Sequence, residues 1–246
     1  MPGPAYVELT ARIRDSSDLM ELVLVKNAFD SWLVHRDIQY ILHIPYLPYA
    51  RQDRVCNRGE AHSLKVIAQL INNMNFDAVY LTDPHSIVAE TLIDNCVVKP
   101  QQTIMDSADW LWNNLHRGRL KFVIVAPDAG AEKKAQAVAQ HFGCDMIRAT
   151  KRRDVATGKI LEIGFIDPIP ENRSFLIVDD ICDGGGTFIP LAGELAKHNA
   201  KSVELYVTHG IFSKGTQILL DCFDTIHTTD SFYEGESTDN IKVIHI

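Results

Sequence analysis

Short apolar runs alternate along the chain with segments whose apolar residues recur at helical spacing. Strands that feed crossover helices in a mainly parallel sheet produce this alternation, so the pattern predicts an α/β fold. In the first part of the chain, strands are expected at residues 38–44 and 78–81. Helices are expected after Ser17 and over residues 62–73 and 87–95.

The first of these helices has a regular apolar spacing. Leu22, Val25, Phe29 and Trp32 follow one another at intervals of three, four and three residues, which predicts one apolar helical face. Asp18 suits the positive end of the helix dipole.

The pattern divides the chain into two halves. Periodicity is lost around residues 98–102, which include Pro100, so we expect a boundary between halves at 1–99 and 100–246. The alternation then restarts with a helix containing Trp110 and Leu115. The further strands are predicted at residues 122–126, 174–178 and 202–207, and the further helices at 131–142, closed by Gly143, and 187–198.

Loops follow the predicted strands in both halves. They cover residues 83–86, 127–130 and 179–186, and a proline-rich turn at 45–49 leads into a polar loop at 50–60. Open α/β sheets bind ligands at the carboxyl ends of their strands, so these loops are the expected functional segments.

Composition narrows the range of functions. The 246 residues are 46% hydrophobic and 23% charged, as in a globular protein, and the net charge is −8. A sequence-blind nucleic-acid or membrane-surface binder should be basic, so we expect neither partner. The five cysteines form no CxxC pair, which indicates reduced thiols in a cytoplasmic protein. No apolar run of 18 residues and no signal peptide is apparent, so no membrane association is expected.

The strongest chemical motif lies at residues 175–187. An apolar strand ends in Asp179 and Asp180, and a triple-glycine turn then leads through Thr187 into a helix. Glycines let successive backbone N–H groups approach a phosphate, and the two carboxylates suit sugar hydroxyls or a metal bound to them. No lysine precedes Thr187, so this is not a P-loop. A simple turn and helix cap is the alternative, which the paired carboxylates and Thr187 disfavour.

Residues 178–187 resemble the phosphoribosyl pyrophosphate-binding motif of type I phosphoribosyltransferases and ribose-phosphate diphosphokinases. Residues 45–54 are close to a signature of the diphosphokinases that ordinary phosphoribosyltransferases lack. Three further segments match the diphosphokinases in order along the chain: 83–86, a metal-binding loop; 126–130, a pyrophosphate-side loop; and 208–213. The resemblance implies two phosphoribosyltransferase-like α/β halves with mainly parallel sheets flanked by helices, of which the first binds ATP and the second ribose phosphate.

The resemblance also implies roles for single residues. The implied ATP contacts are Arg51, Gln52, Arg54 and His85, and the implied metal-side residues are Asp83, His85 and Asp128. The implied ribose-phosphate site comprises Asp179, Asp180, Asp183, Gly184, Gly185, Gly186 and Thr187. Lys151 and Arg153 correspond to the catalytic cations of a mobile loop, here expected at residues 154–158.

Each of these assignments has a plainer alternative. Residues 51–54 alone resemble a solvated surface turn, and a lone histidine such as His85 is usually a core residue. Asp128 is equally suited to cap the following helix. Asp94 matches a metal-side aspartate by spacing, but on a helix it is as easily a solvated residue.

The implied reaction transfers the β,γ-diphosphoryl group of ATP to the anomeric hydroxyl of ribose 5-phosphate, with Mg²⁺ as cofactor. The implied assembly is a homo-oligomer with shared active sites. Gly184 stands where many relatives have a larger threonine, and residues 55–62 also depart from the family. Both departures motivate a larger acceptor such as ADP-ribose as the second hypothesis. A phosphoribosyltransferase is the third hypothesis, and a non-catalytic regulatory homologue is the fourth.

Relatives usually carry a strand and an adenine-clamping loop before the region that matches residues 6–14, and further sequence after Ile246. In place of that loop the printed sequence has only residues 1–5, which include no acidic or aromatic residue. We therefore expect adenine binding and subunit contacts to differ most from those of relatives.

Overall fold

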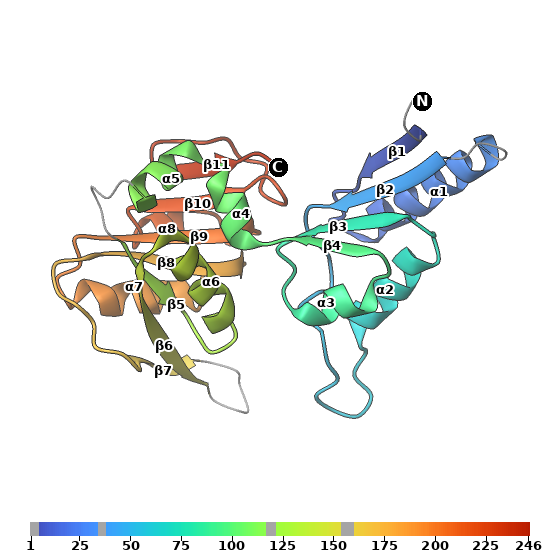
Figure 1. The fold of residues 1–246 in the computed structure, drawn as a ribbon. Helices are drawn as coiled ribbons and strands as arrows, with labels where there is room; N and C mark the ends of the chain where they lie inside the picture. Colours follow the sequence, from blue (N-terminus) through green and yellow to red (C-terminus); the bar gives the residue numbers. More distant parts are fainter. Residues whose placement is uncertain (1–4, 34–37, 117–121, 154–159) are drawn as a thin grey trace. The chain divides into compact units, whose positions relative to one another are not determined.

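The computed structural model describes residues 5–33, 38–116, 122–153 and 160–246. The chain divides into two compact units, Met1–Pro100 and Gln101–Ile246 (Figure 1). Each unit is built on its own sheet, and each is described by itself below.

The first unit alternates strands and helices from its start. Its described elements are β1 (Ala5–Thr10), α1 (Ser16–Trp32), β2 (Ile38–Ile44), α2 (Ser63–Asn72), β3 (Ala78–Thr82), α3 (Ile87–Leu92) and β4 (Cys96–Lys99). Among the described residues the four strands pair in the order β1-β2-β3-β4, and every pair is parallel. One apolar cluster joins the sheet to all three helices, and Leu42, Leu64 and Ala89 are fully buried in it.

The first helix begins earlier than predicted. Asp15, not a residue after Ser17, is the N-cap, because its carboxylate accepts hydrogen bonds from the backbone N–H groups of Ser17 and Asp18. The Asp18 carboxylate bonds back to the Asp15 N–H and completes a capping box. The buried face is also shifted: Leu22 and Lys26 are buried, whereas the side chain of Trp32 is 74% exposed.

Lys26 can be buried because its ammonium is paired. It lies 2.5 Å from Asp30 Oδ1 and 4.2 Å from the centre of the Tyr40 ring. An ion pair and an aromatic face together satisfy a lysine that is otherwise costly to bury.

The second unit contains a larger, mixed sheet. Its described strands are β5 (Phe122–Ala126), β6 (Asp145–Arg153), β7 (Ile160–Phe165), β8 (Ser174–Cys182), β9 (Ser202–Gly210), β10 (Thr225–Thr229) and β11 (Ile241–Ile244). They pair in the order β11-β10-β9-β8-β5-β6-β7, and all pairs are parallel except β6 with β7. The helices are α4 (Gln101–Asp106), α5 (Asp109–His116), α6 (Glu132–Phe142), α7 (Phe188–Ala196) and α8 (Gln217–Leu220).

Apolar clusters cover both faces of this sheet. Along β8, Phe175 and Ile177 belong to one cluster with α7, while Leu176 and Val178 belong to the other with α4, α5 and α6. Alternate side chains of a strand point to opposite faces, so a central strand covered on both sides is apolar at every position. All five residues of β5 are accordingly buried.

Several predicted strands and helices agree with the structure. β2 and β5 have the predicted bounds, and α6 ends at Gly143 in the left-handed conformation expected of a C-cap. The helix predicted over 87–95 stops at Leu92, because the next residue, Ile93, is extended. The segment at 98–102, where periodicity is lost in the sequence, contains the end of β4 and the start of α4.

Two further findings concern the cysteines and the apolar character of the helices. The five cysteines are all free thiols. Among the described residues, no helix combines the length and the apolarity that crossing a bilayer requires.

We predict that Leu176→Ala destabilises the second unit by about 3 kcal/mol, because it opens a cavity under a fully buried central strand. Urea unfolding of the whole chain measures this. Ile166→Ala, at a side chain that is 59% exposed, is the matched control and should change the free energy of unfolding by less than about 0.5 kcal/mol. Equal effects of the two substitutions would contradict the proposed core.

Candidate functional site

The strand that leads into the glycine turn is longer than predicted. β8 continues to Cys182, so Asp179 and Asp180 lie within the strand and not in the loop expected at 179–186. The reason is that pairing with β9 continues past Val178: Asp179 lies opposite Val207, and Cys182 lies opposite Gly210. The pairs at Asp179 and at Ile181, on either side of Asp180, therefore hold the backbone that carries both carboxylates.

The glycine turn that follows is closely packed. Gly185 has φ of 73°, and a Cβ there would lie 2.8 Å from Leu219 Cδ2 and 3.1 Å from Ile189 Cδ1. Only glycine fits this position. Thr187 occupies the N-cap of α7, yet its side chain makes no capping hydrogen bond. A simple helix cap therefore does not explain the Thr187 hydroxyl.

The two adjacent carboxylates have different surroundings. Asp179 Oδ1 accepts a hydrogen bond of 2.9 Å from the backbone N–H of Asp180, while Asp180 Oδ2 lies 3.7 Å from Lys134 Nζ on α6. Burial raises the pKa of Asp179 well above its usual value, and the charges of Asp180 and Asp128 raise it further. Three carboxyl groups thus converge at the carboxyl ends of β5 and β8.

Gln101, the first residue of α4, supports the backbone at this edge. Its side-chain amide is buried and donates to the carbonyl oxygen of Asp179 at 2.6 Å and to Thr208 Oγ1 at 3.2 Å. It thereby connects the ends of the neighbouring strands β8 and β9.

Asp128 follows β5 and serves two purposes. Its Oδ1 accepts hydrogen bonds from the backbone N–H groups of Gly130 and Ala131, at 2.8 and 3.1 Å, so it closes the turn before α6, whose N-cap is Ala131 and not Asp128. Its Oδ2 forms an ion pair with Lys151. Burial disfavours the charged form of Asp128. The hydrogen bond and the charge of Lys151, together with the two backbone hydrogen bonds, outweigh this effect and lower the pKa of Asp128 below its usual value. The alternative of Asp128 as the helix N-cap is therefore wrong, because its carboxylate closes the preceding turn and pairs with Lys151.

Lys151 lies on strand β6, where it is paired with Ile163 of β7 in an antiparallel ladder. The lysine and Asp128 line an open pocket of about 340 Å³ together with Gly130, Glu132 and Thr150. The loop predicted at 154–158 and the side chain of Arg153 lie outside the described part of the chain. Arg153 itself is the last residue of β6.

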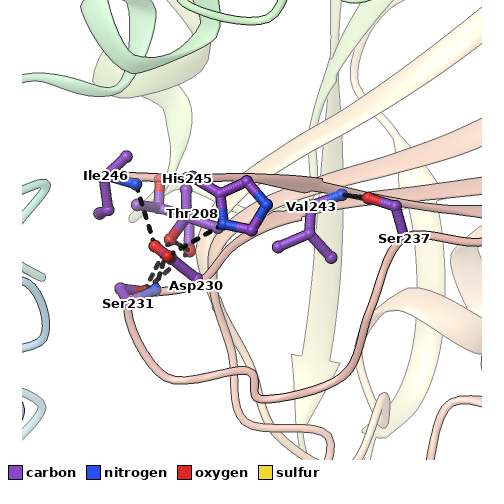
Figure 2. Close-up of polar contacts among 8 residues, drawn as sticks. Thr208, Asp230, Ser231, Ser237, Val243, His245 and Ile246 are labelled. Carbon is purple, nitrogen blue, oxygen red and sulfur yellow. Dashed lines mark hydrogen bonds and ion pairs between the residues drawn. The ribbon is translucent and has the colours of Figure 1, made fainter.

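Buried polar groups hold the ends of β9 and β10 beside this site. Ser231 Oγ donates to the Thr208 carbonyl at 3.2 Å and lies 2.8 Å from His209 Nδ1, and Thr229 Oγ1 donates to the same carbonyl at 2.7 Å. Figure 2 shows the contact between Ser231 and Thr208. Next to it, the carboxylate of Asp230 accepts a hydrogen bond from the Ile246 N–H at 3.0 Å. The segment at 208–213 is thus held in place at its start, where the Thr208 carbonyl in β9 accepts both hydrogen bonds.

In the first unit, the loops after β2 and β3 meet. Asp53 is buried, accepts a 2.9 Å hydrogen bond from Arg54 Nε, and is close to Ser86 and His85. Burial opposes ionisation of Asp53, but these neighbours lower its pKa. Gln52 Oε1 accepts from Ser63 Oγ at the start of α2. The 51–54 segment is therefore a fixed loop, although the Arg54 side chain is 76% exposed.

Asp83 and Asp94 are placed very differently. Asp83 is buried directly after β3, with an unusual φ of 39°. Such backbone strain in a non-glycine residue clusters at functional sites. Asp94 lies after α3, not within a helix, and immediately before β4, where its N–H donates to Asn72 Oδ1 at 3.0 Å. Because β3 and β4 are parallel, Asp94 is at the opposite end of these strands from Asp83, so the two carboxylates do not lie together.

The sequence prediction missed Gln101 and Lys134 as contributors. Each acts through a contact with a residue that was predicted, and no local pattern distinguishes them. Within the described ranges, no three His, Cys, Asp or Glu side chains are grouped closely enough to hold a metal by themselves.

Comparisons with known proteins agree with this architecture. The family model described as phosphoribosyl transferase domain matches residues 98–238. The ribose-phosphate pyrophosphokinase of Hyphomonas neptunium is 30% identical over 94% of this chain and 73% of its own length. That of Mycoplasmopsis pulmonis is 30% identical over 82% of this chain, which spans 62% of the relative. The crystal structure of phosphoribosylpyrophosphate synthetase from Mycobacterium smegmatis superposes with a TM-score of 0.80 at 23% identity, over 98% of this chain and 78% of that one.

We predict that Lys151→Met raises the pKa of Asp128, because the ammonium that favours its charged form is lost. Carboxyl-carbon NMR titration measures the shift. In the wild-type protein the pKa of Asp128 is lowered by folding. The ion pair with Lys151 therefore stabilises the fold fully above the unfolded-state pKa of about 4, and this stabilisation is lost as the pH falls through the lower pKa of the folded state. Lys201→Met, at an exposed lysine before β9, should leave the Asp128 titration unchanged. An unchanged titration in Lys151→Met would refute the pair.

Proposed function

The chain belongs to the ribose-phosphate pyrophosphokinase family, and from this membership we propose that it transfers the β,γ-diphosphoryl group of ATP to ribose 5-phosphate. The products are phosphoribosyl pyrophosphate and AMP. The observation that best supports this reaction is the grouping of Lys151, Asp128 and the Asp179–Asp180 pair at the strand edge that continues into the glycine turn.

The reaction is an in-line displacement at phosphorus. The anomeric oxygen of the ribose forms a bond to the β-phosphorus of ATP, the bond from that phosphorus to the α–β bridging oxygen breaks, and the hydroxyl proton is released. Positioning and charge neutralisation supply most of the acceleration in such reactions.

The ribose phosphate is proposed to bind in the second unit. Backbone N–H groups of the turn at residues 183–187 and the N-terminus of α7 suit its phosphate. Asp179 and Asp180 suit the ribose hydroxyls, because a carboxylate beside a phosphate-binding turn would repel the phosphate itself. Gln101 fixes the Asp179 backbone, and Lys134 partly offsets the negative charge of the pair.

Lys151 is the proposed cation for the transferred group. Its ammonium is paired with Asp128, and both residues line an open pocket. A transferring diphosphoryl group carries more negative charge than one carboxylate, and we infer that Lys151 moves onto it, joined by Arg153 from the end of the same strand. In the first unit, Arg51, Gln52, Arg54 and His85 are the proposed ATP contacts.

The carboxylates present fit a magnesium ion shared with substrate. Mg²⁺ prefers oxygen ligands and is commonly held by one or two carboxylates together with substrate phosphates, which requires no complete protein cage. In the second unit, taken by itself, the proposed metal-side residues are Asp128 and Asp179. In the first unit, taken by itself, they are Asp83 and His85. The ion supplies charge neutralisation at the phosphate oxygens when bound.

The hypothesis of a larger acceptor loses one of its supports. A glycine at position 184 is expected to leave room for a 5-substituent, but a Cβ on Gly184 would meet Lys214, whose stem occupies that space. Ribose 5-phosphate is therefore the preferred acceptor. We also propose that the protein acts in the cytoplasm as a homo-oligomer with shared sites.

Incubation with ATP, Mg²⁺ and candidate acceptors tests the function by mass analysis of products. We expect equal amounts of AMP and phosphoribosyl pyrophosphate with ribose 5-phosphate. Preference for ADP-ribose would identify the larger acceptor, and nucleobase-dependent pyrophosphate release without ATP would identify a phosphoribosyltransferase. ATP binding without AMP formation would refute the enzymatic proposal.

We predict that Lys151→Ala combined with Arg153→Ala lowers turnover at least about a hundredfold, because both proposed transition-state cations are lost. Affinity for ribose 5-phosphate should change little. Arg173→Ala combined with Lys201→Ala removes the same charge at the opposite ends of β8 and β9 and should retain activity. Unchanged turnover in the Lys151 and Arg153 double variant would refute their assignment.

A further inference from the structure

The turn after β9 packs against the glycine turn of the ribose-phosphate site. The backbone N–H groups of Ile211 and Phe212 both donate to the carbonyl of Cys182, at 2.9 and 3.1 Å. Cys182 is the last residue of β8 and directly precedes the glycine turn. One carbonyl oxygen therefore fixes the spacing between the two turns.

Phe212 fixes the direction that this second turn takes. Its φ is 45°, an unusual value for a large residue, and its ring is buried against Tyr233 at a centroid distance of 5.4 Å. The Gly215 N–H closes the turn by donating to the Phe212 carbonyl at 2.8 Å. Lys214 thus projects from a turn whose two ends are held.

The stem of Lys214 lies across Gly184. A Cβ built on Gly184 would be 3.1 Å from Cε, 3.3 Å from Cδ and 3.6 Å from Cγ of Lys214. The absence of a side chain at position 184 is what admits the lysine. Throughout the part of the chain that the structure describes, no hydrogen-bond or ion-pair partner is found for the Lys214 ammonium.

We propose that Lys214 is a substrate-binding residue that reaches over Gly184 and binds the phosphate on the 5-carbon of the acceptor ribose. This rests on the proposed function, which places that phosphate at residues 183–187. The backbone N–H groups of the turn supply directional hydrogen bonds, and Lys214 adds a mobile positive charge from outside the turn. The pair of a glycine at 184 and a lysine at 214 acts as one recognition element.

The plainer explanation is a surface lysine whose apolar stem covers a glycine and whose ammonium remains in water. The two explanations differ in what Lys214→Met does. Methionine retains much of the apolar stem and removes the charge, so a covering role survives and a phosphate contact does not.

Equilibrium binding of ribose 5-phosphate without ATP is the decisive measurement. We expect Lys214→Met to weaken binding about tenfold or more, as for loss of a charge-assisted hydrogen bond, and to raise KM more than it lowers kcat. Lys214→Arg should largely restore affinity, and Lys201→Met should match the wild type. Binding of unphosphorylated ribose should not respond to Lys214→Met. Wild-type affinity in Lys214→Met, or equal weakening in Lys201→Met, would overturn the proposal.

Gly184→Thr provides an independent test without changing the lysine. The added side chain must displace the end of Lys214, so affinity should fall, and adding Lys214→Met should cause little further loss. Thermal unfolding checks that both variants fold. Fully additive losses would overturn the proposed pairing of the two positions.

The binding assay also separates this inference from the proposed reaction. Wild-type protein that binds ribose 5-phosphate in a Lys214-dependent way but releases no AMP would refute the transfer and retain the Lys214 contact. Wild-type protein that does not bind ribose 5-phosphate would refute both.

Discussion

Parallel pairing of β5, β8 and β9 is the constraint on which the second unit depends. The registers place Val125 opposite Ile177, and Ile177 opposite Leu205, so these buried strands present their carboxyl ends at one edge. Asp128, Asp179 and Thr208 then come together although long stretches of sequence separate them. A slip of one residue would exchange the two apolar faces, so the packing that stabilises the sheet also positions the site.

The same convergence creates an electrostatic problem that the neighbouring elements reduce. Asp128, Asp179 and Asp180 share one edge, and the pKa of Asp179 is raised mainly by burial and further by the charges of Asp180 and Asp128. Lys151 from β6 pairs with Asp128, and Lys134 from α6 lies near Asp180. Two lysines on different elements therefore offset the negative charge of this edge.

The apolar pattern predicted the central strand β5 well, because residues buried on both faces of a sheet must be continuously apolar. It failed at the ends of β8 and β9, where Asp179, Asp180 and Thr208 lie within the strands although they are polar. Residue types and family resemblance indicated Asp128 and Lys151. Gln101, Lys134 and Lys214 were missed, because their significance comes from contacts across the fold and not from neighbours in sequence.

The Cys182 carbonyl has a consequence for how the acceptor pocket can change. Since it accepts from both Ile211 and Phe212, neither the glycine turn nor the turn bearing Lys214 can be reshaped without disturbing the other. If only one of the two turns were replaced by the corresponding turn of a relative, the new turn would not fit the turn that remained. Redesign or divergence of acceptor preference should therefore proceed by joint replacement of residues 182–187 and 211–215, with the intervening helix α7 and strand β9 left as a constant frame.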